Sequence, residues 1–260
     1  MSKLRAFNIS GLNLLVSPFL QTEGDLIRCV NVDAFPIGGK TKRPGYITYL
    51  GTPDNARVTS LFDWHKDDGT TFWNYRLSGG TLYYSTQGTG DWTVCGNGTF
   101  SAGAQMGHAV SANTLMVGDG TLTVRASTTG TSFTDPAAAP IANFLAEYQG
   151  RIYAGGTASS LFYSTIGTPT DWTTDSSSVD IPGPGRINSV FKAADRLITT
   201  KNSGNIFRWD GYNLFDMATR QGPTSAQGVG NFDDYRIWPN RLGLYGYNGE
   251  TPKLISSPVQ

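Results

Sequence analysis

One short phrase occurs twice in this chain, and this repetition constrains the fold more than any other feature. The first copy begins at Leu82 and reads Leu-Tyr-Tyr-Ser-Thr, followed by a Gly/Thr turn and Asp-Trp-Thr. The second copy begins at Leu161 and reads Leu-Phe-Tyr-Ser-Thr, followed by a similar turn and again Asp-Trp-Thr. The two copies start 79 positions apart. Repetition at a fixed period is typical of folds that are assembled from similar units.

Half of this interval, about 40 residues, is the length of one blade of a β-propeller. Apolar, aromatic-rich segments recur at that spacing, with intervals of 40, 39, 45 and 38 residues. They begin at Leu82, Leu122, Leu161, Ile206 and Leu244. Each has candidate strands before and after it, which gives four short strands per repeat. The pattern predicts an all-β chain that forms a β-propeller of about five four-stranded blades.

The composition agrees with short strands and tight turns, because the chain has 32 glycines and 12% aromatic residues. A β-sandwich or a turn-rich β-solenoid stays open as an alternative. Residues 137–145 alone look mildly helical, and Pro136 and Pro140 argue against a long helix there. The fourth strand of each blade is expected at residues 91–94, 131–133, 171–174, 212–217 and 252–255.

The first 57 residues do not follow the blade pattern. We expect residues 1–57 to form an extended arm with a closing strand or hairpin, and residues 58–260 to form the propeller. The arm carries seven Lys or Arg and four acidic residues, so its formal charge is +3. Its densest basic cluster is a candidate contact loop for a partner subunit or passing DNA, and a solvated loop tip is the alternative. This loop comprises Lys40, Lys42, Arg43, Pro44 and Gly45.

The charge and cysteine content exclude several classes of protein. The formal net charge is zero, which argues against bulk attraction to nucleic acid or an anionic membrane. Cys29 and Cys95 are too few for a disulfide scaffold, and we expect both to be free thiols in strands. No signal-peptide pattern and no apolar run of membrane-spanning length is visible, so we expect a soluble chain made in a reducing cytoplasm.

The repeated phrase resembles the Asp box of sialidase-like propellers, which places Asp and Trp on a β-turn. Asp boxes mark the fold and do not catalyse. We therefore expect Asp91 and Asp171 to cap turns, and Trp92 and Trp172 to pack between blades.

No catalytic, metal or cofactor site stands out, and we expect that the chain is not an enzyme. There is no G-x-S-x-G nucleophile elbow, and the Gly-Gly-Lys-Thr at residues 38–41 lacks the upstream glycine of a P-loop. His65 and His108 are the only histidines; spacing alone neither assigns nor excludes a triad, and Asp63-Trp64-His65 reads as a strand end. Sialidase chemistry would need three convergent arginines, and Arg76, Arg125, Arg151 and Arg196 show no spacing that marks such a set.

Four phrases in order resemble bacteriophage virion proteins of the tail-tip type, similar to the nozzle (tail tubular) proteins of short-tailed phages. They lie at residues 38–46, 161–172, 195–198 and 243–256. The resemblance implies a non-enzymatic subunit of the virion tail, assembled in the host cytoplasm. Such subunits form a ring, commonly a hexamer, which conducts DNA and holds adaptor, tube or fibre proteins.

The same resemblance places residues 42–45 at a structural corner or a subunit contact. Nozzle proteins are usually much longer than 260 residues, so a neck, hub or fibre-attachment protein with the same module is also open. An alternative from another class is a carbohydrate-binding or sialidase-like propeller that acts in host attachment.

Overall fold

The computed structural model describes residues 56–87, 91–218, 220–225, 228–232 and 235–256, together with four two-residue strands nearer the N-terminus. The chain divides into two compact units, Met1–Tyr49 and Leu50–Gln260. In the first unit, β1 (Gly11–Leu12) pairs in parallel with β2 (Asp25–Leu26), and β3 (Val32–Asp33) pairs antiparallel with β4 (Thr41–Lys42). The extended arm expected at residues 1–57 otherwise lies outside the described residues.

The second unit consists of five antiparallel sheets that follow one another in chain order. The first sheet contains β5 (Val58–His65), β6 (Phe72–Ser78), β7 (Thr81–Thr86) and β8 (Thr93–Thr99). The second contains β9 (Gly107–Ser111), β10 (Thr114–Gly118) and β11 (Arg125–Ser127). The third contains β12 (Phe144–Tyr148), β13 (Arg151–Gly155), β14 (Ser160–Tyr163) and β15 (Ser177–Asp180). The fourth contains β16 (Ile187–Ala193), β17 (Arg196–Lys201), β18 (Ile206–Trp209) and β19 (Leu214–Ala218), and the fifth contains β20 (Gly230–Phe232), β21 (Tyr235–Asn240), β22 (Gly243–Tyr247) and β23 (Lys253–Leu254).

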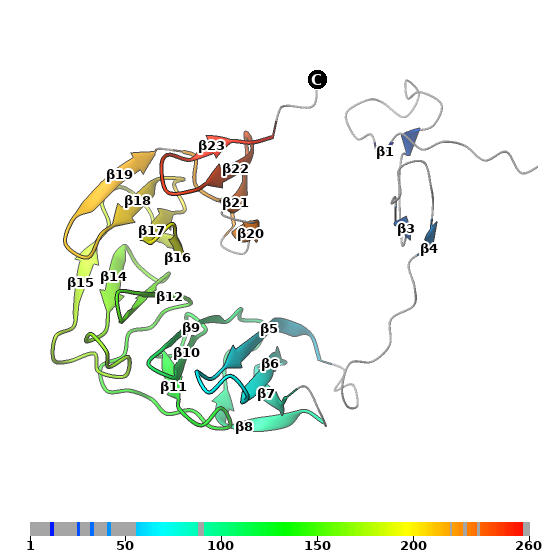
Figure 1. Ribbon diagram of the computed structural model, residues 1–260, viewed down its shortest axis with the longest axis vertical. Coiled ribbons are helices and arrows are strands. Elements are labelled where there is room, and N and C mark those ends of the chain that lie inside the picture. The colour runs from blue at the N-terminus through cyan, green and yellow to red at the C-terminus, as the bar shows by residue number, and fades with distance from the viewer. Residues whose placement is uncertain are drawn as a thin grey trace, which may run out of the picture. The chain divides into compact units, whose positions relative to one another are not determined.

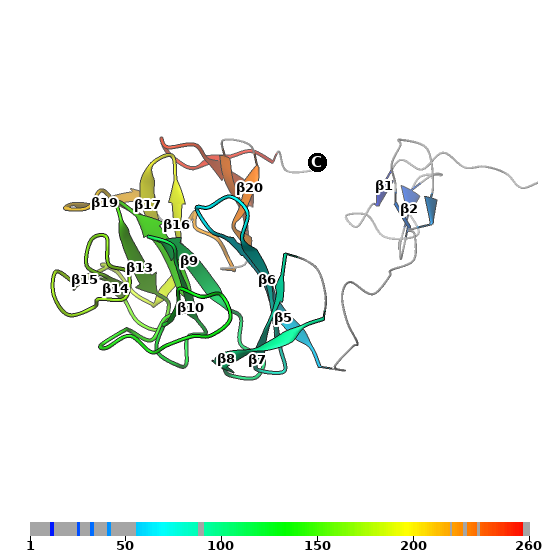
Figure 2. The ribbon, with the colours of Figure 1, turned by 60° about the horizontal axis from the view of Figure 1, so that its bottom comes forward.

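The predicted all-β propeller of about five blades is confirmed. Figure 1 shows the five sheets following one another around an arc, and the tilted view in Figure 2 shows the same succession. The part of the chain that the structure describes contains no α-helix. Residues 137–145, which looked mildly helical, form a turn that leads into β12 instead. Ala139 N donates there to Pro136 O at 3.2 Å.

Two of the expected fourth strands differ from the structure. In the second sheet, residues 131–133 form no strand of their own; Ser132 makes an isolated parallel bridge with Gly96 of β8, and Thr134 bridges Ala126 of β11. This segment therefore joins the first sheet to the second. In the third sheet, residues 171–174 form a turn, and the fourth strand is β15, six residues further on. These residues form a turn because Asp171 accepts hydrogen bonds from backbone N–H groups that a strand would use to pair with its neighbour.

Four hydrophobic clusters hold the sheets together, one between each pair of successive sheets. Phe62, Trp64 and Tyr75 of the first sheet meet Leu115 and Val117 of the second, for example. The clusters between the second and third, third and fourth, and fourth and fifth sheets are built in the same way. Burial of such large apolar side chains stabilises each interface by roughly 1.5–3 kcal/mol per side chain.

Close approach of the sheets requires glycine at specific positions. A Cβ at Gly118, on β10, would lie 2.2 Å from Ala142 O, on the chain leading into the third sheet. A Cβ at Gly130 (φ +81°) would lie 2.3 Å from the ring of Trp73. Any larger side chain at either position would force the second sheet away from its neighbour.

Among the described residues, the sheets at the two ends of the series have a neighbouring sheet on one face only. β10 is buried throughout, and β13 and β17 are buried after their first residue, so the three middle sheets are covered on both faces. β6 instead alternates between half-buried and buried positions over Phe72–Arg76, because only one face of the first sheet meets a neighbour. Among the described residues, no hydrophobic cluster joins the fifth sheet to the first.

Candidate functional site

The structure describes only part of the basic loop that the sequence singled out. Lys42 lies in β4, where its backbone pairs with Val32. Lys40, Arg43, Pro44 and Gly45 lie outside the described residues. Their role as a subunit or DNA contact stays a prediction.

In the second copy of the repeated phrase, Asp171 organises a turn and Trp172 fills a core. The Oδ1 atom of Asp171 accepts hydrogen bonds from Thr173 N (2.8 Å), Thr173 Oγ1 (2.9 Å) and Thr174 N (3.1 Å). The Thr174 side chain first, and then the backbone and side chain of Thr173, hold the pKa of Asp171 well below its usual value. Trp172 is buried in the cluster between the second and third sheets. This copy of the phrase is scaffold.

The first copy has a different environment. Asp91 is exposed and Trp92 is only half-buried. The guanidinium of Arg76 lies over the Trp92 ring at 5.0 Å and over the Tyr83 ring at 4.8 Å. Trp92 therefore belongs to a cation–π stack on the first sheet. The same sequence motif thus has a different structural role in each of the two blades.

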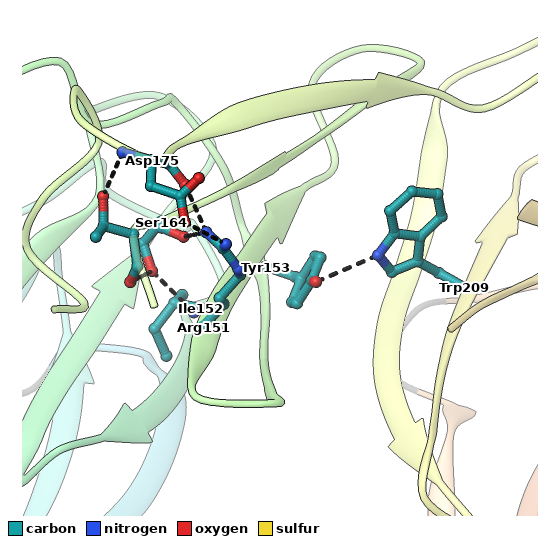
Figure 3. A network of polar contacts seen from close by, with 7 residues as sticks. Arg151, Ile152, Tyr153, Ser164, Asp175 and Trp209 are labelled. Carbon is teal, nitrogen blue, oxygen red and sulfur yellow. Dashed lines mark hydrogen bonds and ion pairs between the residues drawn. The ribbon is translucent and has the colours of Figure 1, made fainter. Parts of the chain in front are cut away.

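A polar network fixes the third blade around the second copy, as Figure 3 shows. Arg151 donates to Ser164 O at 2.8 Å and to Asp175 Oδ2 at 2.6 Å. Ser164 Oγ accepts from Ile152 N at 3.0 Å. Arg151 thereby connects β13 to the segment that precedes β15. Its role in the described structure is to stabilise this blade.

Aspartates with the same turn geometry recur in four blades. Asp68, Asp119, Asp171 and Asp210 each accept hydrogen bonds from the backbone N–H groups two and three residues ahead. Backbone bonds, led by that from Thr71, lower the pKa of Asp68 to about 2. Burial raises the pKa of Asp119, but bonds from Leu122, Ser101 and Thr121 outweigh it and the pKa is lowered. Asp68-Gly69 and Asp119-Gly120 are thus turns.

The best-defined candidate site lies at the centre of the five sheets. A cavity of about 550 Å³ is lined by residues of all five. The first strand contributes in each of the first four sheets, and β21 contributes in the fifth. The charged and titratable residues that line it are Asp63, His65, His108, Glu147, Lys192 and Arg236.

Both histidines of the chain line this cavity. His65 Nε2 lies 2.9 Å from Asp63 Oδ2, and the His65 ring stacks on Phe72 with the ring centres 4.9 Å apart. The ring of His108 stacks on Phe62 at 4.5 Å. His108 is exposed on the strand surface, yet partial desolvation by the protein around its ring lowers its pKa, while the Asp63 carboxylate acts in the opposite direction.

The cations come from the fourth and fifth sheets. Arg236 is half-buried and donates from Nε to Lys192 O at 2.9 Å. Burial lowers the pKa of Arg236. Lys192 is exposed and lies 3.6 Å from Asp195 Oδ1. Glu147, on the third sheet, accepts a hydrogen bond from Gly150 N at 2.9 Å.

Sequence reasoning named His65 and His108 but did not bring them together, and it missed Glu147, Lys192 and Arg236 as a set. The available signal is positional. Each of these residues lies on the strand that the repeat places nearest the centre of the propeller, or on its hairpin partner, so the blade register itself points to the cavity.

The arrangement does not resemble the catalytic set of a sialidase. None of Arg76, Arg125, Arg151 and Arg196 lines the central cavity. Among the residues that the structure describes, no group of three or more His, Cys, Asp or Glu is placed to hold a metal ion. Cys95, expected to be a free thiol in a strand, is free and buried in β8; Cys29 lies outside the described residues. No helix within the described ranges is long and apolar enough to cross a membrane.

Comparison with known proteins identifies the fold alone. No family model matches the chain, and no curated protein matches it. The extracellular domain of the putative one-component system BT4673 from B. thetaiotaomicron is similar over 82% of this chain and 29% of that one, with 14% identity and a TM-score of 0.54.

A nidogen/laminin complex is similar over 74% of this chain and 75% of that one, with 10% identity and a TM-score of 0.52. U3-55K is similar over 80% and 69%, with 10% identity and a TM-score of 0.51. At such identities the likeness concerns architecture only. The chain is therefore similar to β-propeller proteins in fold.

Proposed function

We propose that this chain is a structural protein of a bacteriophage tail or neck. It would form part of an oligomeric ring, such as a nozzle or the end of a tail tube, that conducts DNA and anchors fibres or neighbouring tail proteins. The support from sequence is the ordered set of phrases at residues 38–46, 161–172, 195–198 and 243–256.

The observation that carries the proposal is the exposure of large apolar side chains on the two end sheets of the series. On the first sheet, Leu61 is 71% exposed and Val94 is 55% exposed, in the same row across the strands as Arg76 and Tyr83. On the fifth sheet, Ile255 is 48% exposed and Tyr235 is 37% exposed.

Large exposed apolar side chains gathered on a sheet face mark sites of protein–protein contact. The three middle sheets are covered by a neighbouring sheet on both faces, whereas each end sheet exposes apolar side chains on one face. A chain of this kind is suited to assembly, because contact with neighbouring protein would complete the burial that the fold leaves unfinished.

The zero net charge fits a conduit for DNA, because strong attraction to phosphates would hold back passage. DNA binding should therefore be weak and should change little with salt. A steep fall in affinity with rising salt would contradict this part of the proposal.

Electron microscopy and sedimentation of the purified full chain test the assembly, together with Leu61→Asp. We expect ring-shaped oligomers that Leu61→Asp weakens. Tyr212→Asp is the matched control, since Tyr212 is 89% exposed but lies in the turn before β19, away from both end faces. A monomer at all concentrations, or equal loss in both variants, would contradict the proposal.

A carbohydrate-binding propeller for host attachment is the second candidate. It is supported by the half-buried aromatic rings of Tyr83 and Trp92, which flank Arg76 on the first sheet. Such rings could stack on sugars. Glycan-array binding that Trp92→Ala abolishes would favour this candidate over the first.

A further inference from the structure

We propose that the central cavity binds a small organic molecule through its carboxylate, with the guanidinium of Arg236 as the principal contact. This site goes beyond the proposed structural role, and it does not depend on how the chain assembles. The cavity, at about 550 Å³, has the size of a small-molecule site.

Arg236 is a half-buried cation that forms no ion pair with any residue that the structure describes. Its Nε atom is committed to Lys192 O at 2.9 Å, and this bond fixes the side chain against β16. Among the described residues, its two terminal nitrogens have no hydrogen-bond acceptor and no ion pair. A partly desolvated guanidinium in this state gains most from an anionic acceptor, and a carboxylate matches the fork of its N–H groups.

Other donors lie around the same cavity. Among the described residues, Lys192 Nζ has only the 3.6 Å contact with Asp195. His108 contributes a ring that stacks on Phe62 and makes no hydrogen bond to a described residue. Besides Arg236, Lys192 and His108 can therefore each donate a hydrogen bond to an acceptor on a ligand in the cavity.

The two acidic residues limit the charge of that ligand. Asp63 is paired with His65, and Glu147 caps the turn to β13, yet both line the cavity. Their negative charge disfavours a phosphate dianion or nucleic acid and leaves the singly charged carboxylate as the best match. A carboxylate could come from a free organic acid or from the Asp or Glu side chain of a partner, and the experiment separates these sources.

The test is calorimetric titration of the full chain with propionate, a singly charged carboxylate, at an ionic strength held constant with sodium chloride. We expect saturable binding that Arg236→Gln weakens by at least about tenfold, because a charge-assisted bidentate contact is lost. Arg241→Gln is the matched control, since Arg241 is exposed and lies outside the cavity. Arg236→Lys keeps the charge but not the fork, and an intermediate affinity would support bidentate recognition.

A second arm uses a short peptide with blocked termini and a single Glu under the same conditions. Binding of this peptide but not of propionate, lost in Arg236→Gln, would assign the carboxylate to a polypeptide partner. Circular dichroism and thermal unfolding establish that each variant is folded. Absence of saturable binding by both probes, or binding that Arg236→Gln leaves unchanged in a folded protein, overturns the proposal.

Discussion

The indole Nε1 of Trp209 donates a 3.2 Å hydrogen bond to the hydroxyl of Tyr153, which joins the fourth sheet to the third (Figure 3). Both side chains are buried in the cluster between these sheets. Burial also raises the pKa of Tyr153, so its hydroxyl stays protonated at all physiological pH values.

This bond should contribute measurably to stability. We expect Tyr153→Phe to lower the free energy of unfolding by about 0.5–1.5 kcal/mol, because the Trp209 donor is left without an acceptor. Trp209→Phe should cost more, since it also removes buried ring area. Urea unfolding of both single variants and the double variant gives the coupling energy, and a coupling near zero would show that the bond contributes nothing.

The two tryptophans of the repeated phrase should contribute unequally to the free energy of unfolding. Trp172→Ala empties a buried position between two sheets, and we expect a loss of about 3–5 kcal/mol. Trp92→Ala removes a half-buried ring that lies against Arg76, and should cost about half as much or less. Thermal and urea unfolding of the two variants compare them directly. Equal losses would contradict the assignment of different environments.

The turn aspartates should make the protein sensitive to acid. The pKa values of Asp68, Asp119, Asp171 and Asp210 are lower in the folded chain than the ordinary value near 3.8. Their stabilising effect is therefore fully present above about pH 4 and is lost as the pH falls through the folded values, about 2 for Asp68. Melting temperatures measured from pH 6 to pH 2 should fall over this window.

Asp171→Asn should flatten part of this fall, because asparagine keeps an oxygen acceptor but does not titrate. Asp216→Asn serves as the control, since Asp216 is exposed on β19 and accepts no side-chain hydrogen bond from the described residues. The same flattening in both variants would mean that the Asp171 turn is not the cause.

Lys201 should stabilise the fourth sheet although its side chain carries a charge. It is fully buried, and its Nζ donates to Ile181 O at 2.8 Å and to Gly183 O at 2.5 Å. Lys201→Met leaves these carbonyls without their donor, and we expect a loss of roughly 1–3 kcal/mol. Lys192→Met, at an exposed position, should change stability by no more than about 0.5 kcal/mol. Urea unfolding distinguishes them, and a neutral Lys201→Met would refute the role.

Most of the blade architecture was predictable because it depends on local pattern. The segments at Leu82, Leu161, Ile206 and Leu244 all lie in strands of separate sheets, in the predicted order. Leu122 was placed a few residues early, since β11 begins at Arg125. The sequence of residues 171–174 is polar and β-compatible, so it is consistent both with a strand and with a turn capped by Asp171. The hydrogen bonds to Asp171 decide for the turn.

The candidate site was less predictable. Arg236 and His65 are far apart in the sequence, and no motif connects them. They line one cavity because each blade presents its inner strands to the centre, so the spacing of charges along the chain carries no direct sign of the site.

The sequence by itself determined the repeat, the all-β class and the number of blades, because hydrophobic alternation and turn residues act over a few positions. Only the tertiary structure decided that Trp172 is buried while Trp92 stacks with Arg76, that both end sheets carry exposed apolar side chains, and that five blades place their charged residues around one cavity. These properties depend on which sheet lies next to which, and side-chain burial and charge desolvation are set by those neighbours rather than by adjacent residues.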